Sequence, residues 1–154
     1  MPKNSISIIC PTLNEAENVE LIYKNIVDKI CTRKDNNLPL VSFSITSCKR
    51  IDLFEKTMNS FLNCVKDIHL IDFWFCIDDN SSEEDREKMQ ATYPWIDYYM
   101  KGPSEKGHRP SMKIIWEKLN EIRPEYWIHM EDDFLFHTPG SYVYKPMQMM
   151  VDSR

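Results

Sequence analysis

The sequence predicts a three-layer α/β/α fold built around a mainly parallel sheet. Short apolar runs of strand length alternate along the 154 residues with longer stretches in which apolar side chains recur at helical spacing. The runs are separated by segments long enough to cross from one strand to a parallel neighbour. Such alternation is typical of βαβ units, which place helices on both faces of a sheet.

Five strands are expected from runs rich in β-branched and aromatic residues. These runs lie at residues 5–11, 41–47, 71–77, 96–100 and 126–130. An apolar helical face predicts helices at residues 19–30, 54–65 and 112–122, and an acidic helix start predicts another at residues 78–89. Two helix starts are indicated by the spacing of a capping box, Asp52 with Glu55 and Ser81 with Glu84.

Acidic residues follow two of these strands directly. Asp78 and Asp79 end the third strand, and the cluster Glu131, Asp132 and Asp133 ends the fifth. Right-handed crossovers bring the C-terminal ends of parallel strands to one rim, where open α/β sheets bind their ligands. We therefore expect both acidic groups to meet in one crevice.

Composition and charge exclude several classes of protein. A net charge of −5 argues against nucleic acid as a partner, because phosphate neutralisation needs clustered lysine and arginine. No apolar run approaches the roughly 20 residues that span a bilayer, and the first residues lack a signal-peptide core, so a cytoplasmic protein is expected. Widely spaced cysteines, odd in number, predict reduced thiols rather than disulfides or a zinc site: Cys10, Cys31, Cys48, Cys64 and Cys76.

Two interpretations of Asp78 and Asp79 stay open. The stretch DDNSS precedes a predicted helix, and these residues are good N-caps. A single cap needs only one acceptor, however, and a second carboxylate at a strand end also suits a ligand, such as the N–H of a pyrimidine base or ribose hydroxyls. The pattern alone favours neither interpretation.

The cluster at residues 131–133 is harder to explain as a turn, because the chain continues with the apolar residues FLF. Adjacent carboxylates that emerge from a buried strand repel one another and lose hydration, so a compensating positive charge is expected. A hard divalent cation, Mn²⁺ or Mg²⁺, is a natural partner for such carboxylates and would in turn neutralise a diphosphate. The sequence therefore predicts a metal site here.

Basic residues precede the helix predicted at 112–122. His108 and Arg109 stand where a helix N-terminus would help to bind an anion, whereas Lys106 is expected to be a solvated loop residue.

His129 lies within the fifth strand and is interpreted as a core histidine with satisfied hydrogen bonds. Beyond the acids, the residues after 136 offer only His137 and Asp152 as a general base.

Four segments in order resemble the donor-binding half of a family 2 glycosyltransferase with the GT-A fold. They are SFSITSCKR, CIDDNSSEED, GHRPSMKIIWEKL and YWIHMEDDFLF, the last containing a DxD-type motif in which Glu131 replaces the first aspartate. The resemblance covers about residues 40–140. It implies a Rossmann-like nucleotide-sugar-binding domain, metal-dependent binding of a nucleoside-diphosphate sugar, with UDP-sugars favoured, and transfer of the sugar to an acceptor hydroxyl.

The same resemblance implies roles for individual residues. Asp133 and Glu131 correspond to the metal-binding positions, and Asp132 to the acid at the ribose and metal. Asp79 corresponds to the acid that contacts uracil. The other positions that correspond to the nucleotide-sugar site are Thr46, Ser47, Cys48, Arg50, Asp78 and Arg109.

Residues 1–25 separately resemble the opening strand and helix of the same family, so residues 1–37 are interpreted as an extra βα unit and residues 38–154 as the nucleotide-sugar-binding domain. The chain ends 21 residues after Asp133, where the family continues into its acceptor half and catalytic base, so an incomplete enzyme is expected. Two alternatives remain. A nucleotidyltransferase would bring a glycine-rich phosphate loop, and only three glycines occur. A non-catalytic α/β module with a phospho-acceptor pocket would need a lysine at a downstream strand end, and none is expected there.

Overall fold

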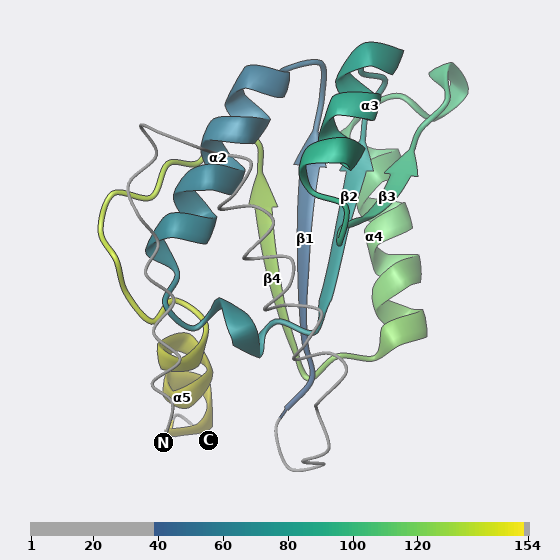
Figure 1. The fold of residues 1–154 in the computed structure, drawn as a ribbon. Helices are drawn as coiled ribbons and strands as arrows, with labels where there is room; N and C mark the ends of the chain where they lie inside the picture. Colours follow the sequence, from purple (N-terminus) through teal and green to yellow (C-terminus); the bar gives the residue numbers. More distant parts are fainter. Residues whose placement is uncertain (1–38, 153–154) are drawn as a thin grey trace.

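The computed structural model describes residues 39–152, and they form a Rossmann-like α/β fold with one four-stranded, all-parallel sheet (Figure 1). The strands are β1 (Val41–Ser47), β2 (Phe73–Asp78), β3 (Asp97–Met100) and β4 (Tyr126–Glu131). The α-helices are α2 (Ile51–Cys64), α3 (Glu83–Thr92), α4 (His108–Ile122) and α5 (Tyr144–Asp152), with short 3-10 helices at Ile68–Leu70 and Pro103–Glu105. The strand predicted at 5–11, the helix predicted at 19–30 and the extra unit at 1–37 lie outside the described residues.

The strand order is β3-β2-β1-β4, so β1 is central and the direction of progression reverses beside it. The chain moves outward from β1 to β2 and β3, and then returns through α4 to place β4 on the other side of β1. The register aligns the strand ends, because Ser47 pairs with Asp78 and Thr46 with Glu131. Strand β1 is therefore paired with β2 on one side and with β4 on the other.

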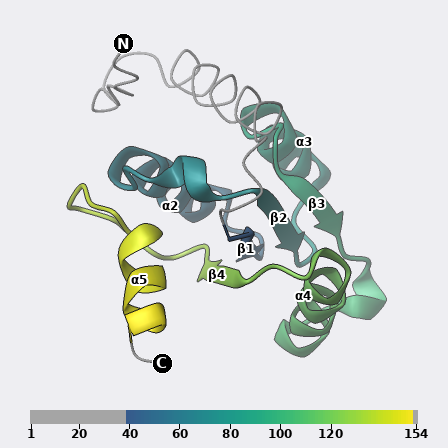
Figure 2. The same ribbon diagram turned by 90° about the horizontal axis from the view of Figure 1, so that it is seen from below.

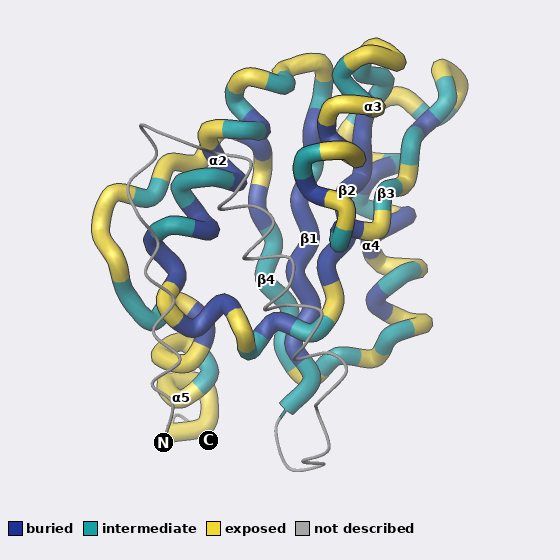
Figure 3. Tube along the Cα trace, viewed as in Figure 1, coloured by how far each residue is buried: buried dark blue, intermediate teal, exposed yellow. Residues whose placement is uncertain are grey.

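Two layers of helices cover the sheet. Figure 2 shows α2 and α3 on one face and α4 on the other. The larger core contains Phe43 of β1, Phe54 and Phe61 of α2, and Tyr93 after α3. The smaller core lies under α4 and includes Phe75, with Trp127 packed against its edge. Because both faces of β1 are covered, this strand is buried along most of its length (Figure 3).

After β4 the chain follows α2 before it forms α5. Thr57 Oγ1 donates to the Phe134 carbonyl at 2.8 Å, and the Phe136 N–H donates to Ser60 Oγ at 3.1 Å. A bridge between Val65 and Gly140 then fixes the end of this segment. None of the helices between residues 39 and 152 combines the length and apolarity that crossing a bilayer requires.

Two helix starts differ from the predictions. Helix α2 has Arg50 at its N-cap and no side-chain cap, so the capping box of Asp52 and Glu55 was wrong. Helix α3 is capped by Ser82, whose Oγ accepts from the Asp85 N–H at 3.1 Å, one residue beyond the predicted Ser81. Ser81 instead accepts a hydrogen bond from the Lys49 N–H, which belongs to the loop after β1.

Candidate functional site

A small cavity of about 140 Å³ opens at the point where the strand order reverses. It lies at the C-terminal ends of β1 and β4, which are neighbours in the sheet but are separated in sequence by two other strands. Crevices at such switch points are the usual ligand sites of open α/β sheets. The residues that line the cavity come from four strand or helix ends: Thr46, Ser47, Cys48, Arg50, Asp79, His108, Ser111, Glu131 and Asp132.

Asp132 is the most buried acid of the predicted metal motif, with 1% of its side chain exposed. Its Oδ2 accepts hydrogen bonds from Ser47 Oγ at 3.2 Å and from the Cys48 N–H at 3.1 Å. Its Oδ1 accepts a hydrogen bond from Nη2 of Arg50, which also supplies the balancing charge. The positive partner that the acids were expected to need is, for Asp132, a guanidinium of the same chain.

The position of Arg50 follows from the loop after β1. Lys49 has a positive φ of 56°, and Arg50 follows as the N-cap of α2, so the chain turns sharply between strand and helix. The Arg50 carbonyl accepts from the N–H groups of Leu53 and Phe54 at 3.0 and 2.9 Å, which anchors its backbone. From this anchored position the side chain reaches β4, where Nη1 also lies 3.8 Å from Asp133.

Asp79 connects the end of β2 to the start of α4. Its Oδ2 accepts from the Gly107 N–H at 2.8 Å, and its Oδ1 accepts from Asn80 Nδ2 at 3.0 Å and lies 3.2 Å from Lys101 Nζ. Desolvation acts to raise the pKa of Asp79, but these donors outweigh it and the pKa is lowered. Both oxygens of the predicted uracil contact are therefore already engaged within the chain.

Lys101 was missed by the sequence analysis. It directly follows β3, has a fully buried side chain, and its ammonium donates to the Gly107 carbonyl and to Ser111 Oγ, each at 2.8 Å. Gly107 has a φ of +110°, a conformation that side-chain-bearing residues rarely adopt. Together with Asp79, Lys101 holds the first turn of α4 against the end of the sheet. The expectation that no lysine stands at a strand end is wrong.

Asp78 lies apart from the cavity and neither caps α3 nor faces the ligand space. Its Oδ2 accepts from Arg86 Nε at 2.7 Å and from the Ser81 N–H at 3.2 Å. Arg86 also donates to the Lys101 carbonyl at 2.8 Å. The two aspartates of DDNSS thus have different neighbours, because successive residues along an extended chain point to opposite faces of the sheet.

Two histidines lie near the acids at the end of β4. His108 Nε2 is 3.8 Å from Glu131 Oε1, and both side chains are largely exposed at the mouth of the cavity. His129 lies on β4 two residues earlier, and its Nδ1 shares a 2.8 Å hydrogen bond with Ser44 Oγ. Burial lowers the pKa of His129. Its Nε2 has no partner among residues 39–152, so the predicted core histidine is satisfied at one ring nitrogen only.

The arrangement of the acids does not fit a preformed metal site. Within residues 39–152, no group of three or more His, Cys, Asp or Glu side chains is placed to hold a metal ion. Both oxygens of Asp132 accept hydrogen bonds from the chain, Glu131 lies near His108, and Asp133 lies outside the cavity with its carboxylate near Arg50. Mn²⁺ or Mg²⁺ binding stays a prediction from the resemblance.

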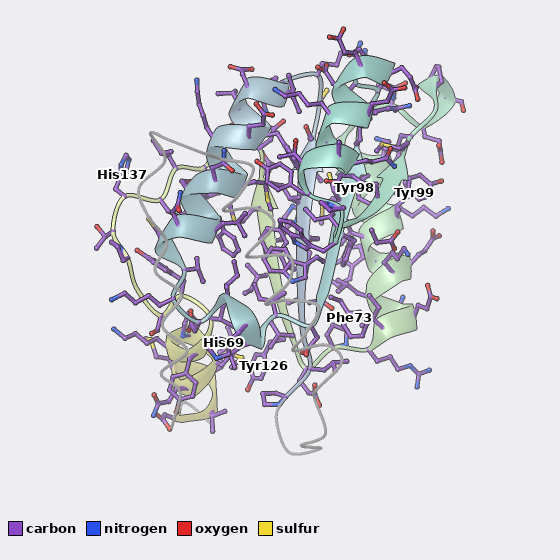
Figure 4. All side chains as sticks on the ribbon, viewed as in Figure 1. His69, Phe73, Tyr98, Tyr99, Tyr126 and His137 are labelled. Atoms are coloured by element: carbon purple, nitrogen blue, oxygen red, sulfur yellow. The ribbon has the colours of Figure 1, made fainter. Side chains whose placement is uncertain are left out.

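Seven of the ten predicted site residues line the cavity, and three do not. Those outside it are Asp78, Asp133 and Arg109. Arg109 follows His108 in α4 but lines a separate groove of about 580 Å³ with Tyr99 and Lys113. Tyr99 is labelled beside α4 in Figure 4. His137 lies on the segment beside α2, away from the strand ends (Figure 4), so it is not placed to act at the cavity.

We compared the chain with protein-family models, curated proteins and solved structures, and none of the three comparisons found a match.

Proposed function

We propose that this chain binds a nucleoside-diphosphate sugar in the cavity between β1 and β4, as the donor-binding part of a GT-A-like glycosyltransferase. The observation that carries the proposal is the position of the cavity at the switch point of a parallel sheet. The four motifs behind the family resemblance support it, because each contributes at least one residue to the lining. A UDP-sugar is the favoured donor.

The chemistry of the lining suits an anionic, hydroxyl-rich ligand. Arg50 is 44% exposed and presents part of a guanidinium, the side chain best suited to phosphate. His108 is the first residue of α4, where the free N–H groups and the helix dipole favour negative charge. Thr46 and Ser111 contribute hydroxyls. We assign the diphosphate to the Arg50 and His108 side of the cavity.

The proposed reaction is transfer of the sugar to an acceptor hydroxyl. The lining residues bind and orient the donor, and Asp79 with Lys101 acts indirectly by holding α4 in place. The general base of this reaction is not assigned. His137 and Asp133 both lie outside the cavity, and Asp79 and Asp132 are engaged by donors of the chain.

Calorimetry with UDP, GDP and UDP-sugars tests the proposal. We expect UDP to bind, and His108→Ala to weaken it by about tenfold through loss of a charge-assisted contact. Arg109→Ala is the matched control, because it removes a cation from the next residue of the same helix but from a different groove. Equal losses in the two variants, or no binding of any nucleotide, would contradict the assignment of the cavity.

The buried lysine favours one alternative, a phospho-acceptor module, because such a module needs an acid and a lysine at neighbouring strand ends. Asp79 and Lys101 meet that requirement. Both Asp79 oxygens already accept hydrogen bonds, however, and only 13% of the side chain is exposed, so attack on a phosphoryl donor is obstructed. Treatment with acetyl phosphate followed by mass spectrometry decides between the two: a phosphorylated Asp79 would favour the module.

A further inference from the structure

We propose that Arg50 is the resident cation of this site, and that it takes the place of the divalent metal expected at the acidic cluster. Anion binding in the cavity is then independent of metal. The identity of the anion as a nucleoside diphosphate rests on the function proposed above. The position and role of the cation rest on separate observations.

The first observation is that both oxygens of Asp132 already accept hydrogen bonds. A hard cation needs carboxylate oxygens that are free to approach it closely. Oδ2 of Asp132 already accepts from Ser47 and from the Cys48 backbone, and Oδ1 accepts from Arg50. Only 1% of this side chain is exposed, so a metal ion could approach it only from the cavity that it lines. A metal ion would have to expel the guanidinium before it could bind here.

The second observation is that one guanidinium serves two acids of the cluster. Nη2 of Arg50 contacts Asp132, and Nη1 lies 3.8 Å from Asp133. A planar fork with five N–H donors can bridge two carboxylates and keep donors for a third group. The side chain is partly exposed and lines the cavity, so it is accessible to a phosphate that enters this space.

The third observation concerns the remaining charges of the lining. Asp79 is neutralised by Lys101, a buried ammonium that no ligand needs to displace. Glu131 lies near His108, which balances it when protonated. With Arg50 in place, the buried acids therefore do not form the concentrated negative charge that would attract a divalent ion. Removing Arg50 should create such a charge.

The test measures Mn²⁺ binding to the full chain without nucleotide, by calorimetry and by the electron paramagnetic resonance signal of free Mn²⁺. We expect no saturable site in the wild-type protein and a gain of at least about tenfold in Mn²⁺ affinity in Arg50→Ala, the scale on which groups around a site alter metal binding. Arg50→Lys retains the positive charge and should show no gain. Arg50→Gln removes the charge but keeps a donor for Asp132, and it replaces Arg50→Ala if that variant does not fold.

A second arm needs no variant. UDP affinity of the wild-type protein in EDTA and in excess Mn²⁺ should agree within about threefold, a small difference on the scale of binding free energies. Saturable Mn²⁺ binding to the wild-type protein alone, no gain in the uncharged variants, or a rise of more than about tenfold in UDP affinity with Mn²⁺ would each overturn the inference. Absence of UDP binding in both buffers would defeat the proposed function, while the Mn²⁺ measurements would still decide the role of Arg50.

Discussion

Replacing Lys101 with methionine tests whether one buried charge holds the cavity together. Methionine is unbranched and close in volume to lysine, so the substitution removes the ammonium while it retains most of the packing of the stem. The variant loses the ion pair with Asp79 and the hydrogen bonds to the Gly107 carbonyl and Ser111 Oγ. Ser111 Oγ also donates to the Gly107 carbonyl at 3.2 Å, so both groups keep one hydrogen bond after the ammonium is removed.

The expected magnitude follows from the burial of the pair. Lys101 is fully buried and Asp79 is nearly so, and removing one partner of a buried ion pair costs about 3–5 kcal/mol of unfolding free energy. Asp79 keeps its bonds to Asn80 and the Gly107 N–H, which favours the lower end of that range. For a chain of this size, the melting temperature should fall by about 10–15 °C.

Urea denaturation and a double-mutant cycle provide the measurement. Asp79→Asn alone leaves the lysine charge buried without its partner, so it should also destabilise the fold. The double variant carries neither charge and should be more stable than the sum of the single effects predicts, by about 1–3 kcal/mol. Lys118→Met is the matched control, because Lys118 pairs with Asp97 at the surface and such pairs contribute at most about 1 kcal/mol.

Two results would refute this reasoning. A loss below about 1 kcal/mol for Lys101→Met, equal to that of the surface control, would mean that the ammonium is not buried against Asp79 in solution. Additive single effects would mean that the two charges do not interact. Either result would also remove the support that the first turn of α4 is assumed to have.

Three further predictions follow from the same contacts. The pKa of Asp79 is lowered in the folded state, so its stabilising contribution is complete above the unfolded-state pKa of about 3.9 and is lost as the pH falls through the folded-state value. The urea midpoint of the wild-type protein should therefore decrease when the pH is lowered below about 4, and the decrease should be smaller in Asp79→Asn. Arg86→Met should cost about 3–5 kcal/mol in urea denaturation, since it leaves the fully buried Asp78 charge unpaired. Iodoacetamide at pH 8 should alkylate Cys48, which is partly exposed and lines the cavity, and should spare Cys76, whose pKa is raised by burial. Peptide mapping should show that bound UDP protects Cys48 from alkylation.

The strands and the layering could be predicted because they depend on the hydrophobic pattern. The runs 41–47, 71–77, 96–100 and 126–130 all become strands within two residues of the predicted bounds. Helix α5 was missed, because none of its residues is fully buried and Met147 alone of its apolar side chains packs against the core. Local pattern thus predicted the elements that bury a whole face and failed for the one that makes a single core contact.

The site was predicted in its location but not in its charge pairing. The C-terminal rim follows from parallel topology, so Asp79, Glu131 and Asp132 could be placed together from sequence. Arg50 and Lys101 lie far from their acidic partners in sequence, and each lies in a loop after a strand, where a basic residue is usually solvated. The only available signal for Lys101 was its position directly after an apolar strand.

The pairing of acids and cations at the strand ends also constrains how this chain can vary. Each buried acid there has a basic partner on another element, and losing that partner leaves a buried carboxylate without compensation. Substitutions at these positions should therefore be tolerated only when both members change together, and related sequences should show correlated replacement at three pairs of positions. These pairs are Arg50 with Asp132, Lys101 with Asp79, and Arg86 with Asp78.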